Sequence, residues 1–339
     1  MRRSINQIIT PASFQGTNSK APYFEGWYYK LVNRDRSRSL ALIPGLALGE
    51  RKDQAHAFLQ AVDAQRGIVA YLRYPLSMFH ADHRRVDVRI GNNRFQTTGF
   101  SVNHEDDTHT LQGEMRFTDI EPYPVGGLHR GIMGPFTFVP FMECRHGVVS
   151  LRHRLEGSLL FDGEWIDFTD GEGYVEKDWG RSFPSAWVWL QASHFAQPGT
   201  SFMFSVAQIP WLGRHFTGLL CFLKTKDRFI RIATYNGARI ERLEITADRV
   251  EARIRHPRGR LDMEAVLSPG SVLRAPKNGV MIGSIEETLE AVVTIRLYDR
   301  AGHVWFEGTG SHTAMEISDG ANRLAVPPVR PVGNHSIHQ

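Results

Sequence analysis

Two short strings of the chain combine carboxylates with aromatic rings. Residues 24–30 read FEGWYYK, and residues 172–191 read EGYVEKDWGRSFPSAWVWLQ. A carboxyl group in a dry apolar pocket holds its proton at neutral pH and can act as an acid. The interior of a β-barrel lined by such indole rings would suit a flat, apolar, ring-bearing small molecule.

Alternation along an extended strand predicts which of these side chains share a face. In the first string it separates Glu25, Trp27 and Tyr29 from Tyr28 and its in-phase neighbours. In the second string, Glu176 and Asp178 are expected on one face and Lys177 and Trp179 on the other. Further along that string, Trp187, Trp189 and Gln191 are expected to share a face.

The candidate site residues follow from these faces. The candidate catalytic residues are the carboxyl groups of Glu25, Glu176 and Asp178. The candidate ligand-binding residues are the rings and polar partners of both strings and two histidines in apolar strand contexts: Trp27, Tyr28, Tyr29, His56, His153, Lys177, Trp179, Trp187, Trp189 and Gln191. His153 is in phase with Leu151 and Leu155 and is expected to face inward. The alternative is that the rings are core residues and that Lys30 and Lys177 neutralise the carboxylates in structural ion pairs.

The elements that must position these residues are strands. Apolar residues recur at every second position from end to end, and Asn, Asp and Gly occupy the turns between them, as in Asp162-Gly163 and Asn236-Gly237. No stretch shows a convincing helical period, so long helices should be few or absent. The sequence predicts an all-β fold whose antiparallel sheets close into barrels or pack as sandwiches.

The length of 339 residues favours two units, each with its own core. The expected division is an N-terminal unit over residues 1–180, a C-terminal unit over residues 181–326 and a loose tail over residues 327–339. The segment 119–136 is rich in Pro and Gly and is expected to be a loop, either a flap over a cavity mouth or an inert strap.

Composition limits the partners. Forty Lys and Arg against 36 Asp and Glu give a net charge of +4, with the charges interspersed, so nucleic acid is not expected. Cys144 and Cys221 lack a redox or zinc spacing, and residues 80–83, HADH, are too short a pattern to indicate a metal site. No metal and no cofactor is expected. Without an apolar run of signal-peptide or membrane-span length, the expected setting is cytoplasmic and soluble, with peripheral membrane contact left open.

The strings FEGWYYK, EKDWG and FPSAWVWLQ, with the later regions 218–237 and 286–316, resemble the tocopherol cyclase family in the same order along nearly the whole chain. Plant members of that family have Asn at position 178 and Phe at position 29, and they carry a plastid transit extension. The chain is therefore most similar to the shorter bacterial relatives. The resemblance implies two consecutive lipocalin-like β-barrels and kinship with a wider group that includes carotenoid hydratases.

The resemblance also implies a reaction. The substrate is a prenylated quinol or phenol, or a related terpenoid. An acid protonates the trisubstituted alkene of a prenyl tail, and the neighbouring phenol oxygen captures the tertiary cation to close a chroman ring. In that scheme Glu25, Glu176 or Asp178 supplies the proton, the tryptophans face the cation, and Tyr28, Tyr29 or Gln191 binds the phenolic head. Two other functions remain open: a non-catalytic carrier of an apolar ligand, and an alkene hydratase in which water traps the cation.

Overall fold

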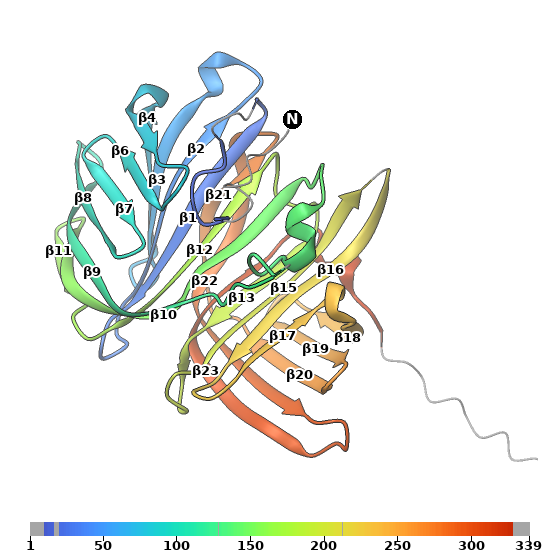
Figure 1. Ribbon diagram of the computed structural model, residues 1–339. Coiled ribbons are helices and arrows are strands. Elements are labelled where there is room, and N and C mark those ends of the chain that lie inside the picture. Colours follow the sequence, from blue (N-terminus) through green and yellow to red (C-terminus); the bar gives the residue numbers. More distant parts are fainter. Residues whose placement is uncertain (1–9, 17–19, 128, 212, 328–339) are drawn as a thin grey trace, which may run out of the picture.

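The computed structural model describes residues 10–16, 20–127, 129–211 and 213–327, and its regular structure is almost entirely β-strand (Figure 1). Residues 328–339 of the expected tail lie outside the described part. Within the described part the helices are single 3-10 turns: η2 (Lys52–Gln54), η3 (Leu76–Met78), η4 (Gly134–Phe138), η5 (Thr234–Asn236) and η6 (Ala321–Leu324). No helix in these ranges is long and apolar enough to cross a membrane.

The first sheet is antiparallel and has the strand order β4-β3-β2-β1-β12-β10-β9-β8-β7-β6-β5, with β11 paired to β10. Its strands are β1 (Tyr23–Val32), β2 (Ser39–Leu48), β3 (His56–Asp63), β4 (Ile68–Pro75), β5 (Phe79–Ala81), β6 (Asp87–Ile90), β7 (Asn93–Gln96), β8 (Gly99–Glu105), β9 (Thr110–Pro122), β10 (Cys144–Phe161), β11 (Glu164–Asp167) and β12 (Glu172–Gly180). The two strings that carry FEGWYYK and EKDWG, β1 and β12, are neighbours in its middle.

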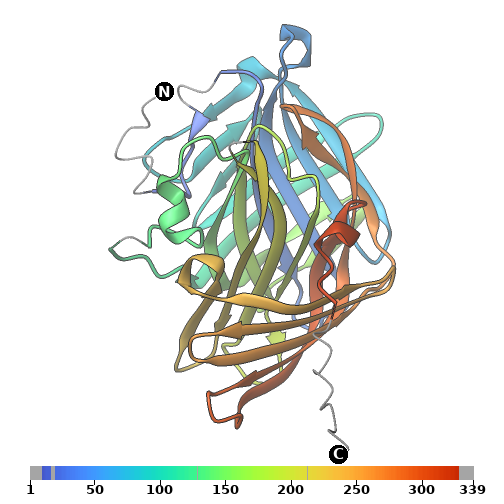
Figure 2. The same ribbon diagram turned by 90° about the vertical axis from the view of Figure 1, so that its right-hand side faces the viewer.

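The second sheet is also antiparallel and has the order β17-β16-β15-β13-β23-β22-β20-β19-β18, with β14 paired to β23 and β21 to β22. Its strands are β13 (Trp187–Ala192), β14 (His194–Phe195), β15 (Ser201–Trp211), β16 (Arg214–Lys224), β17 (Phe229–Ala233), β18 (Arg239–Ile245), β19 (Arg249–His256), β20 (Gly259–Val266), β21 (Ser271–Lys277), β22 (Val280–Tyr298) and β23 (Val304–Ile317). Figure 2 shows how this sheet curls around its own interior.

Three groups of buried side chains organise the molecule. Each sheet encloses an apolar core of its own, one around Leu31 and Phe161 and one around Leu190 and Ile295. A third cluster draws residues from both sheets and therefore lies in the seam between them. The fold is thus all-β, with two consecutive lipocalin-like sheets, and the seam is where side chains of the two sheets meet.

Strand β10 departs from simple alternation. Against β12 it has register irregularities between Val148 and Ser150 and between Ser150 and His153. Each β-bulge turns the following side chains relative to the pleat. As a result Leu151 packs in the seam, whereas Leu155 packs in the first core. The expectation that Leu151, His153 and Leu155 share one face is therefore wrong.

The Pro- and Gly-rich segment also differs in its first residues. Strand β9 continues to Pro122, so residues 119–122 are strand rather than loop; they pair with β10 on one side and extend past the end of β8. Pro122 pairs with Ser150 beside a bulge of β10, where a missing backbone N–H is tolerated. The loop proper runs from residue 123 to residue 143 and contains η4, visible as the green coil in Figure 1.

Candidate functional site in the seam between the sheets

A cavity of about 160 Å³ lies between the two sheets rather than inside either barrel. The sequence led us to expect an indole-lined barrel interior, but the barrel interiors are filled by their own cores. An apolar cavity of about 150 Å³ can hold a benzene ring, so this one admits an aromatic ring. Its lining includes the aromatic side chains Phe24, Tyr28, Phe58, Phe136, Phe183, Trp187, Trp189 and Phe216.

The loop between β9 and β10 closes part of this cavity. Met133, Phe136 and Met142 from the loop are among the lining residues. The Arg145 guanidinium donates hydrogen bonds to the backbone carbonyls of Val139 (2.9 Å) and Met142 (3.3 Å) and so fixes the end of the loop to β10. The segment thus forms a wall of the cavity.

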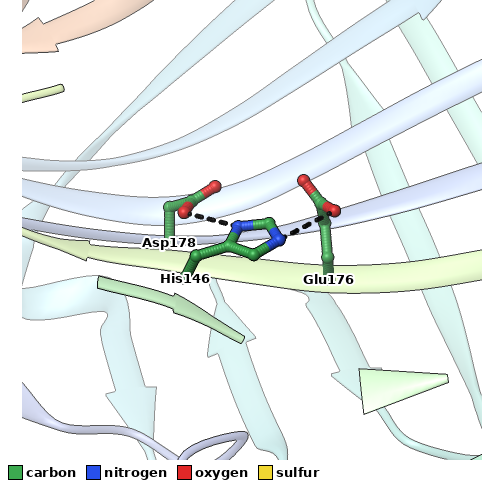
Figure 3. A group of neighbouring side chains, drawn as sticks. All are labelled: His146, Glu176 and Asp178. Carbon is green, nitrogen blue, oxygen red and sulfur yellow. Dashed lines mark hydrogen bonds and ion pairs between the residues drawn. The ribbon is translucent and has the colours of Figure 1, made fainter. Parts of the chain in front are cut away.

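Four ionisable side chains gather on another wall. His146, Glu176 and Asp178 come from the adjacent strands β10 and β12, and Glu316 comes from β23 of the second sheet. His146 Nδ1 lies 3.0 Å from Asp178 Oδ1, and His146 Nε2 lies 3.5 Å from Glu176 Oε2 (Figure 3). The imidazole is therefore held between two carboxyl groups.

Strand register explains why these residues meet. In the register His146 is opposite Asp178, and Tyr28 of β1 is opposite Glu176. Glu316 is opposite Trp189 in the pairing of β23 with β13. Because directly opposed residues of neighbouring strands project on the same side, the pairs converge on the seam.

The Glu176 carboxyl is buried and hydrogen-bonded. The Tyr174 hydroxyl donates to Glu176 Oε2 at 2.7 Å, and the Trp189 indole Nε1–H donates to the same oxygen at 3.2 Å. Trp187 donates to Glu316 in the same way, at 2.8 Å. Tyr28 packs edge-on against Trp189 with 5.5 Å between ring centroids. Each of the two seam carboxyls is thus tied to an indole of the second sheet.

Burial and mutual charge shift the acidities of this group. Burial raises the pKa of Glu176 to about 8, with the His146 charge acting in the opposite direction. Burial likewise raises the pKa of Glu316 to about 7. Burial would lower the pKa of His146, but the charges of Glu176 and Asp178 raise it to about 9. Near neutral pH the cavity wall therefore presents a Glu176 carboxyl that holds its proton more tightly than an ordinary glutamate, beside an imidazole paired with Asp178.

His146, Glu176 and Asp178 are also the one group among the described residues whose ligand atoms lie close enough together, within 4.8 Å, to hold a metal ion. The orientation of the ring limits that possibility. An imidazole ligates through one nitrogen, and the two nitrogens of His146 face different carboxyl groups. If a metal ion bound His146 Nε2, Asp178 would remain the partner of Nδ1 and would not be a third ligand. The arrangement therefore fits an imidazolium between two carboxyl groups better than a metal centre with three ligands.

Of the residues proposed from the sequence, the structure brings five to the cavity: Tyr28, Glu176, Asp178, Trp187 and Trp189. Gln191 lies on the same face of β13, beyond the cavity. Its side-chain oxygen and backbone carbonyl accept hydrogen bonds from the Lys30 ammonium, at 3.0 and 3.2 Å. Lys30 also donates to the backbone carbonyl of His312, so it joins the sheets instead of neutralising a carboxylate.

The other faces of the two strings point away from the cavity into the first barrel. Glu25, Trp27, Tyr29, Lys177 and Trp179 are buried there. Lys177 Nζ lies 2.6 Å from Glu25 Oε1, so this pair matches the alternative of a structural ion pair. Tyr29 packs on Phe95 with 5.4 Å between centroids and belongs to the first core.

Neither histidine proposed from the sequence lines the cavity. His56 Nε2 is 2.7 Å from the Tyr71 hydroxyl, and its Nδ1 is 2.8 Å from the Gln54 carbonyl, so its polar atoms have local partners. His153 is 1% exposed and stacks on Phe117 at 4.0 Å between centroids. Burial lowers the pKa of His153 to about 3, which keeps the ring neutral.

Sequence reasoning missed His146, Glu316 and Glu287. Glu287 of β22 is buried behind the cavity wall and accepts a hydrogen bond from the Tyr28 hydroxyl. Burial raises the pKa of Glu287 well above its ordinary value. Alternation along β22 places Glu287 in phase with Ile285 and Leu289, so that a carboxyl stands on an apolar face. This pattern could have identified Glu287 from the sequence.

Comparisons with known proteins agree on one family. Residues 124–319 match the sequence profile of the family described as tocopherol cyclase-like. A segment of 62 residues is 36% identical to the chloroplastic tocopherol cyclase of Zea mays and covers 18% of this chain and 13% of that protein. A segment of 57 residues is 33% identical to the probable chloroplastic tocopherol cyclase of Oryza sativa subsp. japonica, over 17% of this chain and 12% of that protein. The matched segments thus span about an eighth of these relatives.

Among solved structures, the crystal structure of CghA matches with a TM-score of 0.57 at 11% identity and covers 90% of both chains. The crystal structure of CghA with Sch210972 matches with a TM-score of 0.51 at 13% identity, over 88% of both chains. At such identities the similarity establishes the shared fold.

Proposed function

Since the chain belongs to the tocopherol cyclase-like family, we propose that it closes a chroman ring on a prenylated phenol or quinol by protonating the alkene of the prenyl tail. The observation that carries this proposal is Glu176, a buried carboxyl with a pKa of about 8 on the wall of an aromatic-lined cavity. A carboxyl that keeps its proton at neutral pH is what alkene protonation needs, because alkenes are poor bases.

The proposed step balances within the substrate. The Glu176 proton adds to the less substituted alkene carbon, and the tertiary cation forms at its neighbour. The phenol oxygen then bonds to the cationic carbon, and the phenolic proton returns to Glu176. The net reaction is an isomerisation that consumes no co-reactant.

The surrounding side chains support each stage of this scheme. The His146 imidazolium, 3.5 Å from Glu176, stabilises the carboxylate left after proton transfer. Trp187, Trp189 and Tyr28 line the cavity, and their ring faces can stabilise the cation. The Tyr28 hydroxyl donates a hydrogen bond to Glu287, so the Tyr28 oxygen remains available to accept a hydrogen bond from the phenolic hydroxyl of a substrate.

The test uses geranylhydroquinone as the probe, kept reduced and incubated with the purified chain. We expect a product of unchanged mass that has lost one alkene, and in deuterated buffer one deuterium at the carbon that was protonated. Glu176→Gln should lower the turnover number by a factor on the order of 10²–10⁴, since the amide cannot donate a comparable proton. Chromatography with mass spectrometry measures both.

Glu172→Gln is the matched control, because Glu172 lies on the same strand but outside the cavity and pairs with Arg152. It should retain turnover. Binding of the probe by the native chain without any product would contradict the cyclase and indicate a carrier. A product heavier by one water would contradict ring closure and indicate a hydratase.

A further inference from the structure

Four segments of the chain enclose one end of the seam cavity. They are the loop 123–143, the linker 181–186 between β12 and β13, the hairpin of β15 and β16, and the hairpin of β21 and β22. Each segment contributes at least one side chain to the cavity lining. Met142, Phe183, Phe216 and Pro276 are one lining residue from each.

Backbone bonds and a ring contact join these segments to one another. The Arg181 N–H donates to the Glu143 carbonyl at 2.8 Å and joins the linker to the end of the loop. The Gly279 N–H donates to the Arg181 carbonyl at 2.7 Å and joins the turn between β21 and β22 to the linker. Phe136 of the loop packs on Phe216 of β16 with 6.0 Å between ring centroids. The four segments therefore lie side by side at this end of the cavity.

The loop carries two phenylalanines on its outer side. Phe138 is 46% exposed and Phe141 is 84% exposed, the highest fraction of any large apolar residue in the described part of the chain. Met142, the next residue, is 7% exposed and lines the cavity. The loop thus closes the cavity with its inner side and presents aromatic rings to the outside.

The backbone of the loop imposes the position of Phe141. Its φ of +60° lies in the left-handed region, which bulky residues rarely adopt. Such a conformation persists where the surroundings fix it, and it is frequent in segments that bind ligands. The Arg145 guanidinium holds the backbone carbonyls of Val139 and Met142, one on each side of Phe141. The exposed ring is therefore held outward by the fold of the loop.

The four segments carry an excess of positive charge at this end. Residues 123–143, 181–186, 211–215 and 277–280 contain four lysines and arginines but a single acid. The cations are Arg130, Arg181, Arg214 and Lys277, and the acid is Glu143. The adjoining turn over residues 50–53 reads ERKD, so its charges cancel.

Three of these cations are exposed beside residues that line the cavity. Arg181 is two residues from Phe183, Arg214 is two residues from Phe216, and Lys277 follows Pro276. The Arg181 guanidinium donates to the Asn278 side-chain oxygen at 3.1 Å. Within the described ranges none of the three cations has an ion-pair partner, so their charges are available to an external anion.

The surface of an anionic bilayer matches this combination of groups. Exposed aromatic rings insert at the boundary between lipid head groups and acyl chains, and neighbouring Lys and Arg side chains are attracted by anionic lipids. A prenylated phenol has a large apolar surface and therefore leaves water for a bilayer. A chain docked at this end would have its cavity next to the lipids that hold such a molecule.

We propose that Phe138, Phe141, Arg181, Arg214 and Lys277 form a docking surface for an anionic lipid bilayer. The two rings enter the lipid, the three cations contact the anionic head groups, and an apolar substrate passes from the bilayer into the adjacent end of the cavity. The passage of the substrate rests on the proposed function, whereas the docking itself does not.

Vesicle flotation tests the docking with the full purified chain and no phenol present. One set of vesicles is pure phosphatidylcholine, and the other contains equal parts of phosphatidylcholine and phosphatidylglycerol. We expect the native chain to float with the anionic vesicles and to bind the neutral ones much more weakly, because the cations then lack their counter-charge.

Two variants test the two parts of the docking surface. Phe141→Ser should weaken binding to the anionic vesicles by roughly 10-fold or more, since the ring no longer enters the lipid. Arg214→Gln should weaken it by roughly fivefold, as expected for one basic side chain at an anionic membrane surface.

Trp165→Ser is the matched control. Trp165 of β11 is an exposed aromatic residue too, at 63%, but it is paired with Leu160 at the end of β10 that lies away from the loop. This variant should bind the vesicles as the native chain does.

Several results would overturn the docking surface. The native chain could fail to float with the anionic vesicles, Phe141→Ser could bind as tightly as the native chain, or Trp165→Ser could lose as much binding as Phe141→Ser. Equal binding to neutral and anionic vesicles would contradict the role of the cations. A native dimer that Phe141→Ser dissociates, without any flotation, would assign the surface to a second copy of the chain.

The outcome for docking is separate from the outcome for the reaction. A chain that floats but does not convert geranylhydroquinone would contradict the proposed function alone. A chain that converts the detergent-solubilised probe but does not float would contradict the docking surface alone.

Discussion

At the cavity wall, the charge of the His146 imidazole affects how strongly the Glu176 carboxyl holds its proton. The positive charge of His146 lowers the pKa of Glu176, and burial, which raises it, is the larger effect. The proposed reaction needs Glu176 protonated. Turnover should therefore be highest below about pH 8 and fall as the pH rises through that value.

Replacing the imidazole tests this coupling. His146→Gln removes the positive charge, so the pKa of Glu176 should rise and the basic limb of the rate profile should move to higher pH by roughly one unit or more. Turnover should also decrease, because the carboxylate formed on proton transfer loses its counter-charge. Initial rates with geranylhydroquinone across the pH range measure both effects, and a basic limb that stays in place would contradict the role given to Glu176.

The sequence allowed part of this site to be predicted. Alternation on short strands places Glu176 with Asp178 and Lys177 with Trp179, and the structure has the same faces. The cavity partners His146 and Glu316 could not be found that way. They meet Glu176 only because β10 and β23, distant in sequence, bring them to the seam. Periodicity carries no information on such pairings.

At the scale of the strand, the bulged part of β10 depends on a glycine across from it. Gly173 of β12 is opposite His153 in the register. A Cβ at position 173 would lie 2.3 Å from His153 Nε2, and the ring is already stacked on Phe117. Gly173→Ala should therefore lower the free energy of unfolding by roughly 1–3 kcal/mol through overpacking.

Urea denaturation measures that loss, and a second variant identifies its cause. His153→Ala removes the ring that the new methyl group would meet, so the Gly173→Ala change should cost much less in the His153→Ala background than in the native chain. Equal costs in the two backgrounds would mean that the backbone at position 173, and not the imidazole, requires glycine.

Strands were predictable where both alternation and turn residues marked them. The bulges of β10 were not, because a bulge is defined by the register of a partner strand. The same limit explains the error at residues 119–122. Proline argues against an interior strand position, but the irregular register of β10 near Ser150 accommodates Pro122 at the end of β9.

At the scale of the whole molecule, the seam joins the sheets through buried polar groups as well as apolar ones. Lys30 of β1 donates to Gln191 of β13 and to His312 of β23. Burial lowers the pKa of Lys30 from 10.5 to about 7. In the unfolded chain this amine binds its proton up to about pH 10.5, so between the two values the unfolded state holds more protons than the native state.

The contribution of Lys30 to stability should therefore be least favourable below about pH 7 and should increase as the pH rises toward 10.5. Relative to Lys30→Met, the native chain should gain up to about 1.4 kcal/mol of unfolding free energy per pH unit in that window. Urea denaturation of both chains at about pH 7 and about pH 9 gives the comparison. Parallel changes in the two chains would show that Lys30 does not titrate there.

The all-β character and the pair of lipocalin-like units could be predicted from composition, alternation and family resemblance. The position of the cavity could not. Alternation shows only that a strand has two different faces. Strands β1, β12 and β13 bury one face in a barrel core and the other in the seam. Only the docking of one sheet against the other decides which face becomes a barrel core and which becomes the seam.

The surroundings of Glu176 are assembled from both sheets. The carboxyl of Glu176 comes from the first sheet, while the Trp189 and Glu316 side chains that enclose and perturb it come from the second. Glu316 belongs to β23, the last strand of the described residues. The surroundings that raise the pKa of Glu176 therefore exist only when the two sheets are docked against each other.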